Sequence, residues 1–218
     1  MLKIAIFDSG YGGEEFADRL ESELPTTEII RVIDWRSAEK VLGNPKEARF
    51  IAEKALSPYI GKVDLIVIAN YLISVTSLRY FRRKYKNQKF VGFTLRPRRI
   101  IPDRPTLILT TKAVTRSLAY ISFICRFNTR TICLDSWPAL IDDGELTKER
   151  LIADLSSATA KIKNFTPKQI LLACGQFSEL KSEIHAFFGH NVRVVDSFED
   201  TIKAAHRTLG LRGRSFGK

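Results

Sequence analysis

Three short stretches place polar or reactive side chains directly after a run of apolar residues. Asp8 and Ser9 follow LKIAIF, Asn70 and Tyr71 follow DLIVIA, and Cys174 follows QILLA. A carboxylate can act as a general base and a thiol can donate or accept a proton, whereas an amide can only form hydrogen bonds near neutral pH. If the apolar runs are parallel strands, these side chains lie at the carboxyl ends of the strands, where open α/β sheets bind ligands. The sequence therefore predicts a ligand site built from these stretches.

The elements that must position these residues alternate along the whole chain between apolar, strand-like runs and amphipathic helical stretches. Repeated strand–helix units with near-continuous apolar strands indicate parallel sheets covered by helices on both faces. The segment LRPRRIIPDRP interrupts the alternation with three prolines and a charge cluster, which is typical of a linker. We therefore expect an α/β fold with two doubly wound, mainly parallel lobes, related as a pseudo-repeat and separated by a cleft. The predicted first lobe covers residues 1–95 and about 194–218, and the second covers residues 96–193.

Several helices have boundaries that the sequence predicts. Asn44 is placed to cap a helix whose first turn holds Pro45, and Thr147 is placed to cap another. Amphipathic spacing predicts one helix from about Glu14 to Leu24 and a second, continuous helix from Val114 to Phe127.

Composition places the chain among ordinary globular proteins. Of its 218 residues, 44% are hydrophobic and 27% are charged. No apolar run approaches the roughly 18 residues needed to cross a bilayer. The first residues, MLKIAIFDSG, become polar too soon for a signal peptide. We therefore expect a cytoplasmic protein that has no membrane partner.

The formal net charge of +11 favours anionic partners or small acids. Part of this charge lies on one predicted helical face, where Arg79, Arg82, Arg83 and Lys86 are spaced at i, i+3, i+4 and i+7. The RPRR run from Arg96 to Arg99 adds to it. A solvated basic face is the simpler interpretation. Nucleic acid is the weaker alternative, because no recognised nucleic-acid module accompanies the charge.

The chain has three cysteines, an odd number without CxxC spacing, which indicates neither a disulfide framework nor a zinc site. The apolar surroundings of Cys125 and Cys133 predict buried, inert thiols. The three histidines also lack metal-ligand spacing. We therefore expect no bound metal.

The stretch FDSGYGG is a glycine-rich turn that fits neither the dinucleotide-binding nor the P-loop pattern. Together with TTKAVTRSLAY, ALIDDGEL and LLACGQF, which follow in the same order, it resembles the glutamate racemases of the aspartate/glutamate racemase superfamily. The resemblance covers nearly the whole chain. It implies a two-lobed, cofactor-independent isomerase that binds a small carboxylic or amino acid between its lobes. It further implies a role in supplying D-glutamate for peptidoglycan, and it leaves a homodimer open.

In that family, two cysteines face each other across the substrate α-carbon, and one removes the proton while the other returns it. By this resemblance Cys174 matches the second cysteine, and Asp8 is a general base or a carboxylate that tunes the thiol. The first cysteine falls on Asn70, so the chain resembles a divergent member that lacks the first catalytic cysteine. The resemblance implies a set of substrate-binding positions, which are Ser9, Gly10, Gly43, Asn70, Tyr71, Thr111, Gly175 and Gln176.

These departures from the family pattern have physical consequences. Because Asn70 has no proton to exchange, two-cysteine racemisation of glutamate is disfavoured. Leu72, Gly175 and Val114 stand where the family has hydroxyls that hold an α-amino acid, and each lost polar contact costs on the order of 1–3 kcal/mol.

Three interpretations stay open. The chain is an enzyme of altered specificity, either a racemase or epimerase or a one-cysteine lyase like the relatives that decarboxylate malonate-type acids. Alternatively it is an inactive paralogue that binds a ligand or a protein, or a basic protein associated with nucleic acid. An open polar cleft between Asn70 and Cys174 would favour function. A gap filled by Tyr71 and Phe177 would favour loss of activity.

Overall fold

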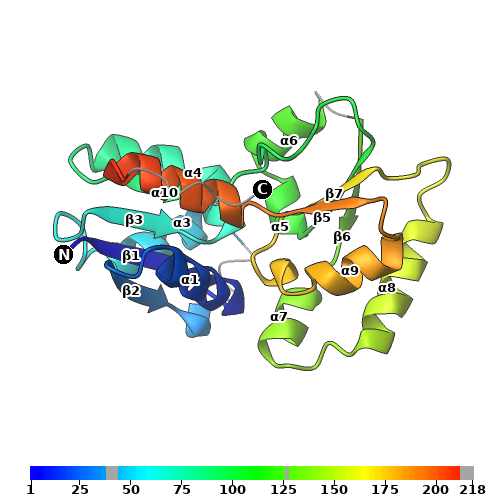
Figure 1. Cartoon of the computed structure of the whole chain (residues 1–218), viewed down its shortest axis with the longest axis horizontal. Helices are drawn as coiled ribbons and strands as arrows, with labels where there is room; N and C mark the ends of the chain where they lie inside the picture. Colours follow the sequence, from blue (N-terminus) through cyan, green and yellow to red (C-terminus); the bar gives the residue numbers. More distant parts are fainter. Residues whose placement is uncertain (38–43, 126–127, 212–218) are drawn as a thin grey trace.

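The computed structural model describes residues 1–37, 44–125 and 128–211, which form two α/β lobes (Figure 1). Each lobe is built around a four-stranded parallel sheet, with strand order β2-β1-β3-β4 in the first and β6-β5-β7-β8 in the second. The second order repeats the first, so the two sheets are topological copies and the predicted fold class is confirmed. The strands are β1 Lys3–Asp8, β2 Glu28–Ile33, β3 Leu65–Ile68, β4 Phe90–Gly92, β5 Thr106–Thr110, β6 Thr129–Cys133, β7 Gln169–Leu172 and β8 Arg193–Val195.

Helices connect the strands and cover the sheets. Those that follow the strands of the first sheet are α1 Tyr11–Glu23, the 3-10 helix η1 Trp35–Ser37, α3 Pro45–Leu56 and α4 Tyr71–Lys84. Those that accompany the second sheet are α5 Lys112–Thr115, α6 Leu118–Ile124, α7 Trp137–Asp142, α8 Lys148–Ala160, the 3-10 helix η2 Gln176–Ser178 and α9 Lys181–Phe188.

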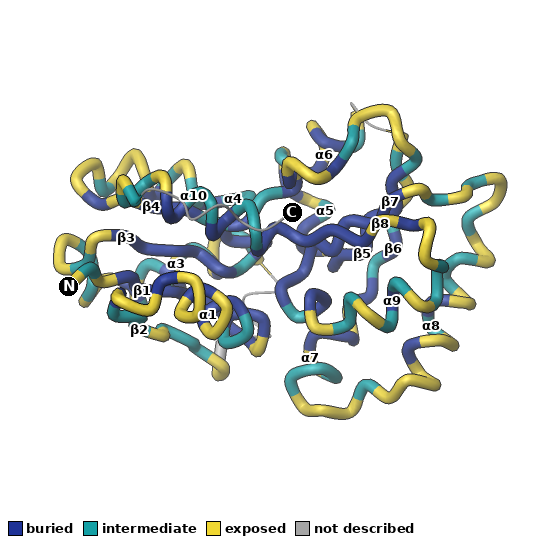
Figure 2. The backbone as a smooth tube through the Cα atoms, viewed as in Figure 1, coloured by how far each residue is buried: buried dark blue, intermediate teal, exposed yellow. Residues whose placement is uncertain are grey.

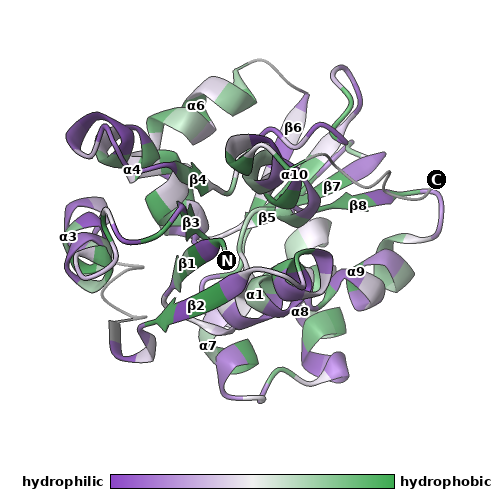
Figure 3. Cartoon of the chain, turned by 60° about the vertical axis from the view of Figure 1, so that its left-hand side comes forward, coloured by the Kyte–Doolittle hydropathy of each residue, from purple (hydrophilic) through white to green (hydrophobic). Residues whose placement is uncertain are grey.

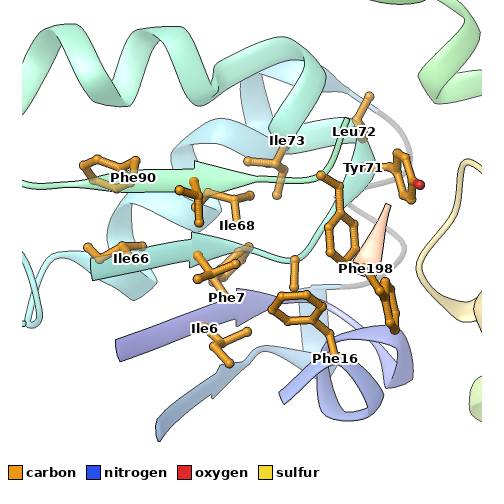
Figure 4. Packing of buried hydrophobic residues seen from close by; sticks show 14 of the residues in the cluster. Ile6, Phe7, Phe16, Ile66, Ile68, Tyr71, Leu72, Ile73, Phe90 and Phe198 are labelled. Atoms are coloured by element: carbon orange, nitrogen blue, oxygen red, sulfur yellow. The ribbon is translucent and has the colours of Figure 1, made fainter. Parts of the chain in front are cut away.

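The last helix, α10 Phe198–Leu209, returns to the first sheet, where it contacts β3 and β4 (Figure 1). Its anchor is Phe198, whose ring lies 5.3 Å from that of Phe16 (Figure 4). The Phe198 ring also lies 5.2 Å from that of Phe93. Burying one such ring stabilises the fold by roughly 1.5–3 kcal/mol. The last helix therefore packs on the first sheet, and the predicted bounds of the two lobes stay a prediction.

The sheets form the buried centre of each lobe, whereas the outer faces of the helices are exposed (Figure 2). In the second lobe, Trp137 is fully buried and its ring packs edge-on against Phe177 at 5.5 Å. The indole Nε1 of Trp137 donates a hydrogen bond to Asp154 at 3.0 Å. Phe177 therefore belongs to the core of the second lobe, and the idea that it fills the gap between the lobes is wrong.

The predicted caps agree with the structure. The side chain of Asn44 accepts a hydrogen bond from the Lys46 amide at 2.9 Å, with Pro45 opening α3. The Thr147 hydroxyl accepts one from the Arg150 amide at 3.2 Å, where α8 begins.

Two predicted helices have different bounds. The first, α1, begins at Tyr11 rather than near Glu14. The stretch predicted as one helix from Val114 is divided into α5 and α6, because the Ser117 hydroxyl accepts a hydrogen bond from the Tyr120 amide at 3.1 Å and starts a new helix. The last residues of that predicted helix, 126 and 127, lie outside the described residues.

The basic stretch and the thiols also differ from expectation. Since α4 ends at Lys84, Lys86 lies beyond the helix and not on its face. Cys125 is exposed and Cys133 is half-buried, so the prediction of buried thiols is wrong for Cys125. Cys125 caps the short α6, whose outer side already exposes Leu118 to solvent. None of the helices within residues 1–37, 44–125 and 128–211 is long and apolar enough to cross a membrane.

Candidate active site between the lobes

A small cavity of about 70 Å³ lies where the two lobes meet. It is lined from the strand ends of both sheets, by Asp8, Ser9, Ala69, Asn70, Tyr71, Leu72, Thr111, Val114, Pro138, Ala139, Asp142, Ala173, Cys174, Gly175 and Gln176. Almost all predicted site residues therefore come together, although their chemical roles stay predictions. Gly10 borders the same place, because a Cβ there would lie 2.4 Å from Gln176 Nε2. Gly43 lies outside the described residues.

The repeated topology gives Asn70 and Cys174 equivalent positions. Asn70 comes two residues after β3 ends at Ile68, and Cys174 comes two residues after β7 ends at Leu172. Strands β3 and β7 hold the same place in their sheets. Asn70 thus occupies, in the first lobe, the position at which the second lobe carries its thiol.

The Asn70 amide is fully engaged in hydrogen bonds. Its Oδ1 accepts from the Ile73 amide at 3.1 Å and so caps α4. Its Nδ2 donates to Asp8 Oδ1 at 2.8 Å and to Ser9 Oγ at 3.3 Å. Asparagine is a favoured residue at a helix N-terminus because its side chain satisfies an unpaired backbone N–H. The side chain therefore supports the structure of the first lobe and has no free donor directed at a ligand.

Asp8 is a buried carboxyl group at the end of β1, with 2% of its surface exposed. Burial raises the pKa of Asp8 to about 7, and the Asn70 amide and the Ser9 backbone N–H oppose this rise only in part. The Ser9 N–H donates to Asp8 Oδ1 at 2.7 Å. Near neutral pH this carboxyl is therefore divided between its protonated and ionised forms, as a group that exchanges protons must be.

The thiol of Cys174 is buried on the second-lobe side of the cavity. Its Sγ donates a hydrogen bond to Gln176 Oε1 at 3.1 Å. Burial raises the pKa of Cys174 far above its usual value, and the nearby Asp8 raises it further. In this arrangement the sulfur is a thiol that can donate a proton, and not a thiolate that can remove one.

Asp142 is a site residue that the sequence did not single out. It lies at the end of α7, and its Oδ1 accepts a hydrogen bond from the Tyr11 backbone N–H at 2.8 Å. Its Oδ2 accepts a hydrogen bond from Gln176 Nε2 at 3.4 Å. The pKa of Asp142 is raised above its usual value, because burial outweighs the opposing effect of these two hydrogen bonds. The stretch ALIDDGEL contributed to the family resemblance and offered a signal, but local spacing does not distinguish Asp142 from Asp143.

The two lobes touch directly at glycines. A Cβ at Gly12 would lie 2.5 Å from the carbonyl carbon of Gly175, a separation that real Cβ atoms do not adopt. The N-terminus of α1 can approach the turn after Cys174 this closely because Gly12 has no side chain, whereas a Cβ at Gly175 would make only an ordinary contact of 3.4 Å with Gly12 Cα. This contact closes the lobes on each other and limits the space between them.

The cavity is too small for an ordinary ligand in this closed form. Ligand pockets usually measure about 300–1,000 Å³, and a water molecule takes about 30 Å³. Tyr71, which is labelled in Figure 4, fills part of the space. Its ring is buried and packs at 5.1 Å from that of Phe93. Its hydroxyl lies beside Ser197 but has no well-aligned hydrogen-bond partner among the residues described. Of the two aromatic residues whose presence in the gap would favour loss of activity, Tyr71 lines the cavity and Phe177 does not.

The chemical character of the lining is acidic and weakly polar. No lysine, arginine or histidine is among the described residues around the cavity, whereas Asp8 and Asp142 contribute two carboxyl groups. Within the described part of the chain, no group of three or more His, Cys, Asp or Glu side chains is arranged to hold a metal ion.

The chain was compared with protein families, with known sequences and with solved structures. No protein family model matches the chain. It is 23% identical to the glutamate racemase of Lysinibacillus sphaericus strain C3-41 and 27% identical to that of Parafrankia sp. strain EAN1pec; these alignments cover 96% of this chain and 82% and 79% of the relatives. The glutamate racemase of Francisella tularensis, solved in complex with D-glutamate, superimposes with a TM-score of 0.82 at 18% identity, over 98% of this chain and 84% of that one. In sequence and in fold, the chain is therefore similar to the glutamate racemases of the aspartate/glutamate racemase superfamily.

Proposed function

We propose that this chain binds a small amino or carboxylic acid between its lobes and does not racemise glutamate by a two-thiol route. The observation that carries the proposal is the position of Asn70. It occupies, in the first lobe, the place that Cys174 holds in the second, and its amide is already hydrogen-bonded within the first lobe. An amide cannot exchange a proton near neutral pH, so no second thiol is available. The D-glutamate bound to the Francisella protein supports a small acid as the ligand class.

The lining favours a ligand with an ammonium group. With two carboxyl groups and no cationic side chain among its described residues, the cavity repels a dianion more strongly than a zwitterion. An ammonium group beside Asp8 would stabilise the ionised carboxylate and return its pKa toward the usual range. The volume of about 70 Å³ favours a short side chain. A ligand as long as glutamate needs the lobes to separate.

A second candidate function is proton transfer by a single thiol. The observation that favours it is the raised pKa of Cys174, which keeps the sulfur protonated and able to supply a proton to one face of a carbanion. Decarboxylation of a malonate-type acid needs one such donor and no base on the opposite face. The acidic lining counts against a dianionic substrate, so small-acid binding remains the leading proposal.

Two measurements on the purified chain test the proposal. The melting temperature is measured across a panel of amino acids and malonates, and exchange of the α-proton for deuterium is followed by NMR in D₂O. We expect small amino acids to raise the melting temperature and to slow iodoacetamide labelling of Cys174. Labelling of exposed Cys125 serves as the internal control and should not change. Racemisation of glutamate at an ordinary enzymatic rate would refute the proposal.

The same panel separates the two candidates. Decarboxylation of a malonate that is lost in a Cys174→Ser variant would assign the chain to one-thiol chemistry. Stabilisation by amino acids without exchange or decarboxylation would assign it to binding alone.

A further inference from the structure

Tyr71 and Gly175 hold equivalent positions in the two lobes. Tyr71 comes three residues after β3 ends at Ile68, and Gly175 comes three residues after β7 ends at Leu172. Both residues line the cavity between the lobes. The first lobe therefore places an aromatic ring in the wall of this cavity at the point where the second lobe has no side chain.

The ring of Tyr71 is fixed by packing within the first lobe. Only 3% of the residue surface is exposed, and the ring lies 5.1 Å from that of Phe93. Phe93 is in turn held by Phe16 and Phe198, whose rings lie at 5.3 and 5.2 Å from its own. In a close-packed interior, a ring cannot swing aside unless its neighbours repack. Tyr71 is therefore a rigid part of the cavity wall.

The backbone of Tyr71 is fixed as well. Tyr71 is the first residue of α4, and the preceding Asn70 caps this helix and donates a hydrogen bond to Asp8 at 2.8 Å. Helix α4 packs beside β3 and β4 (Figure 3). The Tyr71 hydroxyl lies beside Ser197 without a well-aligned hydrogen bond. Packing of the ring and the anchored start of α4 thus hold Tyr71 in place, and its hydroxyl contributes little.

Tyr71 also lies near the thiol of the cavity. A negative charge on Cys174 would raise the pKa of Tyr71, so the phenol and the thiol are within range of each other's electrostatic field. The cavity that both residues line measures about 70 Å³. A ligand that lies beside Asp8 and Cys174 therefore has the Tyr71 ring as a boundary of the space left for its side chain.

We propose that Tyr71 sets the length of the ligand's side chain, so that the cavity accepts an amino acid as short as alanine and excludes one as long as glutamate. This inference rests on the proposed function, because it concerns the ligand of the same cavity. Even one methylene group too many in a fitted pocket changes affinity by about 10–200-fold. A longer side chain would have to displace a ring that its neighbours hold in place.

The test compares alanine with glutamine as ligands. Glutamine has the length of glutamate without the charge that the acidic lining would repel, so the comparison isolates length. Affinities are measured by isothermal titration calorimetry for the unaltered chain, Tyr71→Ala, Tyr71→Phe and Tyr80→Ala. Tyr80 is a matched control, because it lies on the same helix and does not line the cavity.

We expect the unaltered chain to bind alanine about tenfold more tightly than glutamine, or with a larger preference. Tyr71→Ala should reduce this preference about tenfold, because the space of the ring becomes available to the longer side chain. Tyr71→Phe keeps the ring and Tyr80→Ala leaves the cavity wall intact, so both should preserve the preference within about twofold. Circular dichroism establishes that each variant folds. If Tyr71→Ala does not fold, Tyr71→Leu carries the same test with a shorter side chain that keeps apolar packing.

The outcomes separate this inference from the proposed function. If alanine binds and its preference over glutamine is unchanged in the folded Tyr71→Ala or Tyr71→Leu variant, the inference is overturned and the proposed function stands. An equal change in Tyr80→Ala would also overturn the inference, since it would show a general loosening of the first lobe. Glutamine binding that appears only when Tyr71 is shortened would support the length limit, even if the unaltered chain bound no amino acid. Binding of neither ligand to any of these proteins would overturn both.

Discussion

Replacing Asp8 with asparagine tests whether a buried carboxyl group must stay protonated in the folded chain. Burial raises the pKa of Asp8 from 3.8 to about 7 in the folded state. In the unfolded chain the pKa returns to about 4. Between these values the folded state holds a proton that the unfolded state has released, so stability falls as pH rises. The stability that depends on the protonated Asp8 carboxyl group is fully present below about pH 4 and is lost as the pH rises through about 7.

The magnitude follows from the shift. About 3 pKa units at about 1.4 kcal/mol each correspond to roughly 4 kcal/mol, as an order of magnitude. Asparagine keeps an Oδ1 that accepts from the Ser9 N–H and from Asn70 Nδ2, which lie at 2.7 and 2.8 Å from the present oxygen, but carries no charge. The free energy of unfolding of the variant, relative to that of the unaltered chain, should therefore increase by roughly 4 kcal/mol as the pH rises from about 4 to about 9. For a chain of this size that is on the order of 10 °C in melting temperature.

The assay is urea unfolding across this pH range for the unaltered chain, Asp8→Asn and the control Asp143→Asn. Asp143 is exposed and lies outside the cavity lining, so its replacement serves as the control for the loss of an exposed carboxyl group. Burial also raises the pKa of Glu15 to about 7, but Glu15 is present in every protein compared and cancels in the differences. A difference between Asp8→Asn and the unaltered chain that does not vary with pH would refute the reasoning.

Three further predictions concern the lobe contact, the thiols and the cap of α4. Gly12→Ala adds a Cβ 2.5 Å from a backbone carbon of the second lobe, so we expect a lower melting temperature and faster iodoacetamide labelling of Cys174. In the unaltered chain, mass spectrometry should find exposed Cys125 labelled first and Cys174 last, because the buried thiol stays protonated. Asn70→Ala removes the bond to the N-terminus of α4 and should lower the free energy of unfolding by about 1–2 kcal/mol in urea.

The fold could be predicted because the buried strands are short, nearly continuous apolar runs. LIVI in β3 and QILL in β7 have no exposed face, as expected for parallel strands covered on both sides. The polar residues after them gather at one place because carboxyl ends of parallel strands share an edge. Asp8, Asn70 and Cys174 could thus be assigned to one site without a structure.

Features that depend on how the two lobes pack together could not be predicted from the sequence. Asp142 acts through a hydrogen bond to the Tyr11 amide, 131 positions away, and no local pattern encodes such a contact. The cavity volume depends on the approach of Gly12 to Gly175, which spacing cannot give. The division of the predicted helix at Ser117 reflects a side chain that competes with the helix for a backbone N–H, which amphipathic periodicity does not reveal.

If the chain does racemise an amino acid, contrary to the proposal, Asp8 is the group that could serve as the second acid or base. Among the described residues around the cavity, the first-lobe side holds Asp8 and Tyr71 as titratable groups, and burial keeps the pKa of Tyr71 well above its usual range. A phenol of that kind cannot remove a proton near neutral pH, whereas a carboxyl with a pKa of about 7 can. If deuterium entered both faces of an amino acid, Asp8 would have to supply the second exchange. Because the protonated Cys174 cannot remove the α-proton, Asp8→Asn would then abolish both inversion and exchange of the α-proton. Inversion that persists in Asp8→Asn would exclude this carboxyl and require another group to enter the cavity when the lobes open.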